Sequence, residues 1–259
     1  MADERRVTVV TGASQGIGEV IANAFGSVGD AVVLAARNTE NLERVAEDIH
    51  MAGGEALVLA TDVTDASSVE YTMAKTVEVF GRIDAVVANS GVGGPSGVLW
   101  ELDPNEWDSA FEVNVKGVFL TARAAIPHMI HGGAGSFVII GSISGKRPLF
   151  GRTAYTSTKA ALIGLTRTLA LEAGPHNIRV NLISPGFVAG PRIEWVIAAQ
   201  AKARGITADA VRREFEAESP LGQLTSPRAI ADAAVYLASP QAASITGADL
   251  NVNSGVVMY

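Results

Sequence analysis

Short runs of apolar residues alternate along this chain with longer stretches whose apolar positions recur at helical spacing. The short runs predict strands over residues 6–11, 30–36, 55–60, 83–88, 135–141, 177–183 and 247–251. The longer stretches predict helices over residues 17–28, 39–52, 65–80, 104–130, 153–174 and 227–238. Strands that are apolar throughout are typical of a parallel sheet covered by helices on both faces. The pattern therefore predicts an α/β, doubly wound Rossmann fold with a seven-stranded, mainly parallel sheet.

One segment, residues 187–220, interrupts this alternation after the sixth expected strand. It combines the apolar run 195–199 with a charged stretch over 209–218. A long insertion after the carboxyl end of a strand is often a lid or a substrate loop. The alternative is a packed pair of helices without a substrate role. We expect one domain over residues 1–259, with a substrate-loop insertion at about 187–220.

Composition narrows the classes of function. The formal net charge is −7, the isoelectric point is near 5.1 and no basic run is present, so nucleic acid and anionic membrane surfaces are not expected partners. The absence of cysteine excludes disulfides and thiol catalysis, and the four histidines show no metal-ligand spacing. The N-terminus lacks the apolar core of a signal peptide, and no apolar run is long enough to span a membrane. We expect a cytoplasmic protein without a bound metal.

The most informative side chains are Tyr155 and Lys159, on the expected helix 153–174, and Ser142, which follows the strand 135–141. Residues four apart on a helix share a face, so the phenol and the ammonium project into one site. A free phenol has a pKa near ~10, and a nearby cation lowers that pKa toward neutrality. A hydroxyl at Ser142 can donate a hydrogen bond to a substrate carbonyl. A chance surface pair is the alternative, but the strand-end serine favours a catalytic site.

A second motif, Thr11-Gly-Ala-Ser-Gln-Gly-Ile-Gly18, lies between the first expected strand and the first expected helix. Glycines let the backbone approach a pyrophosphate, and the N-terminus of a helix presents N–H groups to it. A tight turn that needs glycine at positive φ is the alternative explanation. The order of strand, glycine turn and helix favours a dinucleotide site.

Together the two motifs resemble the short-chain dehydrogenase/reductase family, and the resemblance covers nearly the whole chain. The matching features are Thr11-Gly12-x-x-x-Gly16-x-Gly18, Asp62-Val63, Ala88-Asn89-Ser90-Gly91, Asn114, Ser142, Tyr155, Lys159 and Pro185-Gly186. The resemblance implies strand order 3-2-1-4-5-6 with a seventh strand added. Two positions depart from the family pattern, because Ala88 replaces an asparagine and Gly190 replaces a threonine. We expect these changes to weaken the grip on the cofactor without abolishing activity.

The resemblance also implies a nicotinamide dinucleotide as cofactor. Its implied contacts are Gly12, Ser14, Gln15, Gly16, Ile17, Gly18, Arg37, Asp62, Val63, Asn89, Gly91, Tyr155, Lys159, Pro185, Gly186 and Val188. Ala36 lacks the carboxylate that would repel a 2′-phosphate, and Arg37 can bind one. Gln15 is a counter-signal, because many NADP-using relatives carry a basic residue in the glycine loop. We therefore expect NADP(H), with NAD(H) as the alternative. The resemblance also implies that Asp62 binds the adenine amino group; the alternative is that Asp62 is only a turn carboxylate beside Thr64.

For catalysis the resemblance implies four residues. Tyr155 would exchange a proton with the substrate, Lys159 would stabilise the phenolate and bind the nicotinamide ribose, and Ser142 would orient the carbonyl. Asn114 would hold a water that relays protons to Lys159. An asparagine is unfavourable inside an apolar helix, and a hydrogen bond at a helix kink is its alternative role. The expected reaction interconverts a small-molecule ketone and a secondary alcohol.

Other functions on the same fold stay open. They are a 3-oxoacyl-[acyl-carrier-protein] reductase-like enzyme, an NAD-dependent diol or alcohol dehydrogenase, and a non-enzymatic NADP sensor. Carrier-protein reductases often have a basic residue at the position of Leu171. The leucine therefore makes the carrier-protein reductase a less favoured alternative. The intact catalytic set argues against the sensor.

Two apolar regions bear on assembly and on the substrate. The helix face 160–165 and the tail 256–259 need cover, so we expect a homotetramer. The expected pocket wall, residues 91–95, 149–150 and 187–195, is mostly apolar. Arg192 is the only charge beside it; it either binds an anionic substituent or has a surface role, and we favour the surface role. Such a wall suits a hydrophobic or cyclic ketone.

Overall fold

Seven strands form one sheet. The computed structural model describes residues 5–259, apart from the side chains of residues 199, 202 and 203. The strands are β1 (Val7–Thr11), β2 (Ala31–Ala36), β3 (Glu55–Ala60), β4 (Ala85–Ala88), β5 (Gly135–Ile140), β6 (Ile178–Pro185) and β7 (Asp249–Val252). Their order is β3-β2-β1-β4-β5-β6-β7, which confirms the predicted Rossmann fold. Every neighbouring pair is parallel, so the sheet that was predicted as mainly parallel is parallel throughout.

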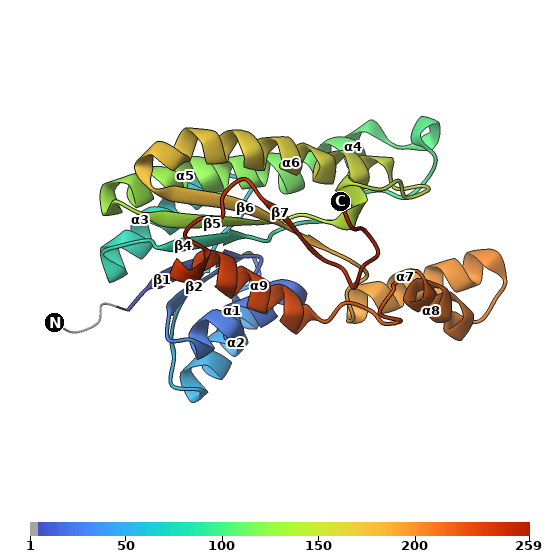
Figure 1. Ribbon diagram of the computed structural model, residues 1–259, viewed down its shortest axis with the longest axis horizontal. Coiled ribbons are helices and arrows are strands. Elements are labelled where there is room, and N and C mark those ends of the chain that lie inside the picture. The colour runs from blue at the N-terminus through green and yellow to red at the C-terminus, as the bar shows by residue number, and fades with distance from the viewer. Residues whose placement is uncertain (1–4) are drawn as a thin grey trace.

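Helices cover both faces of the sheet (Figure 1). One face carries α1 (Gly16–Ser27), α2 (Thr39–Met51) and α9 (Pro227–Ala238). The other carries α3 (Ala66–Phe80), α5 (Gly117–Gly132) and α6 (Thr153–Ala173), with α4 (Pro104–Phe111) packed beside α6. Single 3-10 turns lie at Leu99–Glu101, Ile143–Gly145, Gly174–His176 and Pro240–Ala242.

Each face of the sheet has its own apolar core. Val9 and Phe137 belong to the cluster under α3, α5 and α6, whereas Val10 and Val138 belong to the cluster under α1, α2 and α9. Successive side chains of a strand point to opposite faces, so both neighbours are buried here. This double burial is why apolar residues predominate at successive positions of the central strands. It also fixes the strand ends, where the polar residues of the site begin.

The expected helix 104–130 is helical throughout, but a π-helical turn divides it. α4 ends at Phe111, a π-helical turn spans Glu112–Lys116, and α5 begins at Gly117. The turn contains the buried Asn114. π turns are rare and frequently occur at functional sites. The spacing of apolar residues could not predict this turn. The turn goes together with hydrogen bonds between Asn114 and Val92, which is distant in sequence and leaves no periodic signal.

Beyond the carboxyl ends of the strands, residues 187–220 fold mainly into α7 (Pro191–Arg204) and α8 (Ala208–Ala217), which project from the body (Figure 1). A small core of their own includes Ile197 and Val211, both buried. The helices therefore form a packed pair, and a substrate role for this segment stays a prediction.

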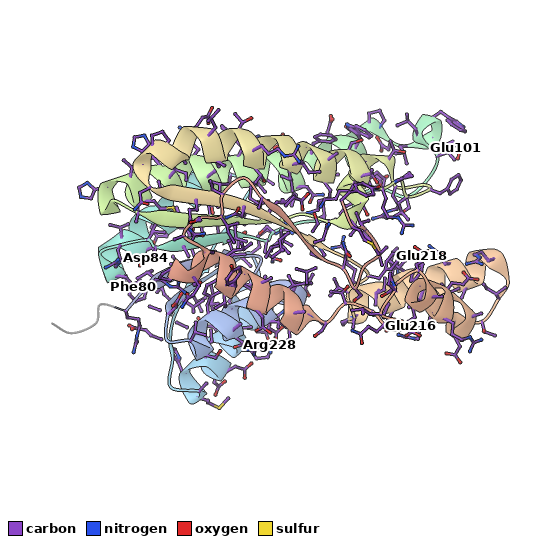
Figure 2. All side chains as sticks on the ribbon, in the orientation of Figure 1. Phe80, Asp84, Glu101, Glu216, Glu218 and Arg228 are labelled. Carbon is purple, nitrogen blue, oxygen red and sulfur yellow. The ribbon has the colours of Figure 1, made fainter. Side chains whose placement is uncertain are left out.

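An ion pair ties this helical pair to the body of the molecule. Figure 2 shows Glu218 just after α8 and Asp84 just before β4, at opposite ends of the sheet. Glu218 accepts a hydrogen bond from Arg147 at 2.7 Å, and Arg147 lies shortly after β5. The pair links α8 to the segment that follows Ser142.

Candidate active site

The glycine loop between β1 and α1 forms one side of the site. Gly12 and Gly16 have φ of +67° and +60°, values that side chains other than glycine rarely adopt. A Cβ on Gly18 would lie 2.1 Å from the Gly12 carbonyl oxygen, so α1 approaches the end of β1 as closely as only glycine permits. The cap residue Gln15 makes no side-chain bond to the helix, which leaves the first N–H groups of α1 available.

Asn89 braces this loop. Its side-chain amide donates to the carbonyl oxygens of Thr11 at 3.0 Å and Gly12 at 3.2 Å. The Thr11 hydroxyl in turn accepts from the backbone N–H groups of Asn89 and Ser90. These bonds join the ends of β1 and β4. The observed role of Asn89 is thus structural, and its direct contact with a dinucleotide stays a prediction.

At the far end of the same edge, Arg37 and Asp62 follow β2 and β3. The Arg37 side chain is exposed and has no ion pair or hydrogen bond in the described part of the chain. Asp62 accepts two hydrogen bonds from Thr64 through Oδ1, which, with the nearby Arg37 charge, lower the pKa of its carboxyl. Its Oδ2 has no partner among the described residues. Val63 is buried, with its side chain against Gly117.

The segment after β6 offers free backbone groups. Val188 forms a β-bridge with Thr225, and neither its N–H nor its C=O has a hydrogen-bond partner among the described residues. Gly186 packs so tightly that a Cβ there would lie 2.8 Å from Asn253 Cα and from Thr225 Oγ1. Packing alone therefore explains glycine at that position, and Pro185 is buried at the end of β6.

These features fit a dinucleotide along the carboxyl edge of the sheet. The open glycine turn with its helix N-terminus suits a pyrophosphate. The unpaired atoms of Asp62, Arg37 and Val188 lie on the segments that follow β3, β2 and β6, on the same edge of the sheet. The residues that would hold the cofactor are Gly12, Ser14, Gln15, Gly16, Ile17, Gly18, Arg37, Asp62, Val63, Gly91 and Val188. Ser14 and Ile17 are half-buried within the turn.

Tyr155 and Ser142 come together from α6 and the end of β5. Ser142 Oγ accepts from the Ser144 N–H at 3.1 Å, so its own proton can be donated to Tyr155 or to a substrate oxygen. Burial raises the pKa of the Tyr155 phenol, but Lys159, Arg192, a hydrogen bond with Ser142 and Arg152 together bring that pKa below its usual value. The phenol is therefore primed to exchange a proton nearer to neutral pH.

Lys159 lies one turn further along α6, as the spacing predicts. Its side chain is only 5% exposed, and Nζ donates to the Ile140 carbonyl at 2.9 Å and lies 5.8 Å from the centre of the Tyr155 ring. Burial lowers the pKa of the Lys159 ammonium, Tyr155 opposes that shift, and Arg192 adds to it. A Cβ on Gly91 would lie 3.7 Å from this Nζ, so glycine at 91 keeps the approach to the ammonium open.

Asn114 connects the π turn to the site. Its Oδ1 accepts from the Val92 N–H at 2.8 Å, and its Nδ2 donates to the Val92 carbonyl at 3.0 Å and to Thr158 Oγ1 at 3.1 Å. Both amide atoms are therefore occupied. The side chain fixes the loop after β4 against α6 instead of projecting freely to a water, and the water-relay role stays a prediction.

Arg152 was not predicted from the sequence as a site residue, and Arg192 was expected to be the only charge beside the pocket wall. Both guanidinium groups lie over the Tyr155 ring, with Cζ at 5.4 and 5.7 Å from its centre. Arg152 is the cap residue just before α6, three positions ahead of Tyr155, which is in the first turn of that helix. That spacing was the signal available in the sequence. The position of Arg192 depends on how α7 packs and could not be derived.

The described residues contain no group of three His, Cys, Asp or Glu side chains placed as metal ligands. None of the helices described is long and apolar enough to cross a membrane.

Comparison with known proteins shows what the chain is related to. Residues 12–257 match the family model described as enoyl-(acyl carrier protein) reductase. The cis-4-hydroxycyclohexanecarboxylate dehydrogenase of Sinomonas cyclohexanicum is 36% identical over 250 residues, covering 96% of both chains. The 3-oxoacyl-[acyl-carrier-protein] reductase FabG of Thermotoga maritima is 31% identical over 255 residues, covering 98% of this chain and 99% of the relative. The crystal structure of NAD+-bound xylitol dehydrogenase has a TM-score of 0.93 at 29% identity, covering 98% of this chain and 100% of the other.

With its wholly parallel seven-stranded sheet and these relatives, the chain belongs to the short-chain dehydrogenase/reductase family. It is an oxidoreductase, as the sequence predicted.

Proposed function

We propose that the protein interconverts a small-molecule ketone and a secondary alcohol, with Tyr155 as general acid and base. The observation that carries this proposal is the meeting of Tyr155, Ser142 and Lys159 at the carboxyl edge of the sheet. The glycine loop lies at the same edge. We place the enzyme in the cytoplasm, which a chain without cysteine fits.

The residues divide the work of carbonyl reduction. A bound reduced nicotinamide supplies the hydride that the carbonyl carbon accepts. Ser142 donates a hydrogen bond to the carbonyl oxygen, and Tyr155 gives that oxygen a proton as negative charge develops on it. The cationic Lys159 stabilises the phenolate left behind. In alcohol oxidation the same phenolate takes the proton back.

Asn114 acts as a positioning residue in this proposal. Its bonds to Val92 and Thr158 join the loop after β4 to the catalytic helix α6. The loop passes Lys159 at Gly91, so its position limits what can reach the ammonium. A water that relays protons to Lys159 would bind beside the π turn, since the amide atoms of Asn114 are occupied.

For the cofactor we propose NADP(H), with NAD(H) as the alternative. The support is the exposed, unpaired Arg37 at the end of β2 together with Ala36, which carries no carboxylate. The structurally similar xylitol dehydrogenase is NAD+-bound, which favours the alternative. Gln15, which is uncharged, also favours NAD(H).

Among substrates, we propose a small cyclic or branched ketone in preference to an acyl carrier protein. The name of the Sinomonas relative describes a hydroxyl on a ring that also carries a carboxylate. The Thermotoga relative supports the competing carrier-protein reductase, which stays the second candidate. A catalytically silent NADP sensor would not need a phenol whose pKa is lowered by nearby cations, so the charges around Tyr155 argue against that function.

A panel assay tests the proposal. The purified protein is mixed with NADPH or NADH and a set of cyclic, linear and carrier-linked ketones, and the loss of nicotinamide absorbance is followed. We expect reduction of at least one small ketone class, faster with NADPH than with NADH. Binding of the cofactor without turnover of any ketone or alcohol would favour the sensor, and turnover of carrier-linked ketones alone would favour the second candidate.

A further inference from the structure

Two arginines from different elements converge over the catalytic phenol. Arg152 is the cap residue of α6, and Arg192 is in the first turn of α7. The Nη2 atom of each lies 3.0 Å from the position that a Cβ on Gly93 would occupy. The two nitrogens therefore lie within twice that distance of each other, next to the Tyr155 ring.

Neither guanidinium has an acidic partner in the part of the chain that the structure describes. Arg152 donates to the Gly93 carbonyl at 2.6 Å and to the Ser96 hydroxyl, which are both neutral acceptors. Arg192 has no hydrogen bond or ion pair among these residues, and its nearest acid in sequence, Glu194, is paired with Arg212. Two positive charges thus meet beside the site without an acidic partner, although Arg192 is exposed and Arg152 is half-buried.

Such a meeting is unfavourable unless something compensates it. Like charges a few ångströms apart repel, and the repulsion grows as water is excluded. Burial lowers the pKa of the Arg152 guanidinium, Tyr155 opposes the shift, and the charge of Arg192 lowers the pKa further. An anion between the two groups would remove the repulsion and satisfy the unused donors of Arg192.

We propose that Arg152 and Arg192 form a subsite that binds a carboxylate group of the substrate. The inference rests on the proposed function, because it takes the ketone to be protonated by Tyr155. Guanidinium groups bind a carboxylate through paired hydrogen bonds, which orients the rest of the molecule. The substrate class is therefore a keto acid and the corresponding hydroxy acid.

The geometry also limits the size of that substrate. Both Cζ atoms lie less than 6.0 Å from the centre of the Tyr155 ring, since their distances are 5.4 and 5.7 Å. The anion must therefore be separated from the reacting carbon by only a few bonds, or by one ring. Binding at the subsite would position the carbonyl beside Ser142 and Tyr155. The subsite therefore selects and orients the substrate, and Tyr155 alone transfers the proton.

The test compares matched acids and esters in the complete enzyme. The probes are 4-oxopentanoate and 3- and 4-oxocyclohexanecarboxylate, each with its neutral methyl ester, and the variants are Arg192→Gln, Arg192→Lys and Arg152→Gln. We expect Arg192→Gln to lower kcat/KM for reduction of the preferred acid by about 10- to 100-fold, as loss of charged hydrogen bonds does. Reduction starts from the protonated phenol, which a higher Tyr155 pKa favours, so kcat/KM for reduction of the ester should change by less than about threefold. Arg192→Lys keeps the positive charge but lacks the paired donors, so its kcat/KM for the acid should lie between those of the wild type and Arg192→Gln.

A matched control and a second readout complete the design. Arg213→Gln removes an exposed arginine on α8 that has no hydrogen bond or ion pair among the described residues, and it should change neither rate. Calorimetry with cyclohexanecarboxylate and cyclohexanecarboxamide on the cofactor-loaded protein measures the subsite without turnover. We expect the carboxylate to bind more tightly, and Arg192→Gln to abolish the difference.

The outcomes separate this inference from the proposed function. If ketones are reduced but no acid is preferred over its ester and Arg192→Gln changes neither, the subsite is wrong and the function stands. If the variants weaken cofactor binding and affect acid and ester equally, the arginines bind the cofactor and the inference is also wrong. If no ketone or alcohol reacts, the proposed function fails, and the calorimetric comparison still decides whether the arginines bind a carboxylate.

Discussion

At the scale of single residues, the phenol of Tyr155 is surrounded by positive charge. Lys159, Arg152 and Arg192 lie 5.8, 5.4 and 5.7 Å from its ring centre, and no acid pairs with either arginine among the described residues. These cations, with Ser142, outweigh the effect of burial and lower the phenol pKa. Proton exchange with a substrate at neutral pH depends on that balance.

Removing one of these charges should move the pH profile of alcohol oxidation. Oxidation needs the phenolate, so its rate rises with pH through the pKa of Tyr155. Because the Arg192 charge lowers that pKa, Arg192→Gln should shift the acidic limb of kcat/KM to higher pH. Steady-state rates on a neutral alcohol across pH measure the shift. An unchanged limb, or a shift to lower pH, would contradict the electrostatic account.

Replacing Arg37 should change the choice of cofactor. Its exposed guanidinium at the end of β2 can reach a 2′-phosphate, which NADPH has and NADH lacks. Arg37→Ala should weaken NADPH by about 1.5–3 kcal/mol, roughly tenfold or more, and leave NADH nearly unchanged. Fluorescence titration of both cofactors measures the two affinities. Equal losses would mean that Arg37 does not read the phosphate.

At the scale of elements, the site depends on how closely α1 approaches β1. Gly18 allows this contact, because a Cβ there would lie 2.1 Å from the Gly12 carbonyl oxygen and 2.4 Å from Asn89 Nδ2. The backbone at Gly12 cannot yield without also disturbing the bonds that join β1 to β4. The same contact thus supports both the fold and the cofactor loop.

Gly18→Ala should therefore lower the thermal unfolding midpoint and weaken cofactor binding at least tenfold. Overpacking of this kind costs about 1–3 kcal/mol. Gly132→Ala is the matched control, because it lies at the end of α5 with no atom within 4 Å of a Cβ, and alanine is favoured over glycine in helices. Differential scanning calorimetry compares the two variants. Equal stability of both would mean that the contact at Gly18 is not limiting.

The sequence predicted most elements because apolar periodicity records burial directly. The strand 55–60 and the helix 227–238 have the predicted bounds, and the fold class follows from their alternation. The sequence did not predict the π turn around Asn114. The side-chain amide of Asn114 forms hydrogen bonds with Val92, which is 22 positions away in the sequence. Contacts between distant segments leave no periodic signal.

The same limit applied to the site. Motifs on single elements, such as the spacing of Tyr155 and Lys159, predicted which side chains share a helix face. Arg192 reaches the phenol only because α7 packs beyond the sheet, so its contact with Tyr155 could not be predicted. Its partner Arg152 was missed although its spacing from Tyr155 was informative.

At the scale of the whole molecule, large apolar side chains are exposed on several elements. Leu171 on α6 is 79% exposed, and the terminal Met258 and Tyr259 are 76% and 78% exposed, although Val257 is buried. Exposed apolar groups of this size often mark contacts between subunits. The predicted homotetramer would cover them.

We expect light scattering at micromolar concentration to give the mass of four chains, each of 26.8 kDa. A Leu171→Glu change should shift the protein toward smaller assemblies, because a carboxylate cannot be buried without a partner. Arg167→Glu, on the same helix, exposed and without an ion pair among the described residues, serves as the control for added negative charge. A monomeric wild-type mass would contradict the expectation.

The most direct test of the account is a comparison of the wild-type enzyme with Tyr155→Phe. Phenylalanine keeps the ring and removes only the hydroxyl that gives the product oxygen its proton. We predict that reduction of the best ketone from the panel falls by about 10²-fold or more, while calorimetry gives nearly unchanged binding of the reduced cofactor. If the variant keeps more than about a tenth of the wild-type rate, Tyr155 is not the general acid, and the central claim is wrong.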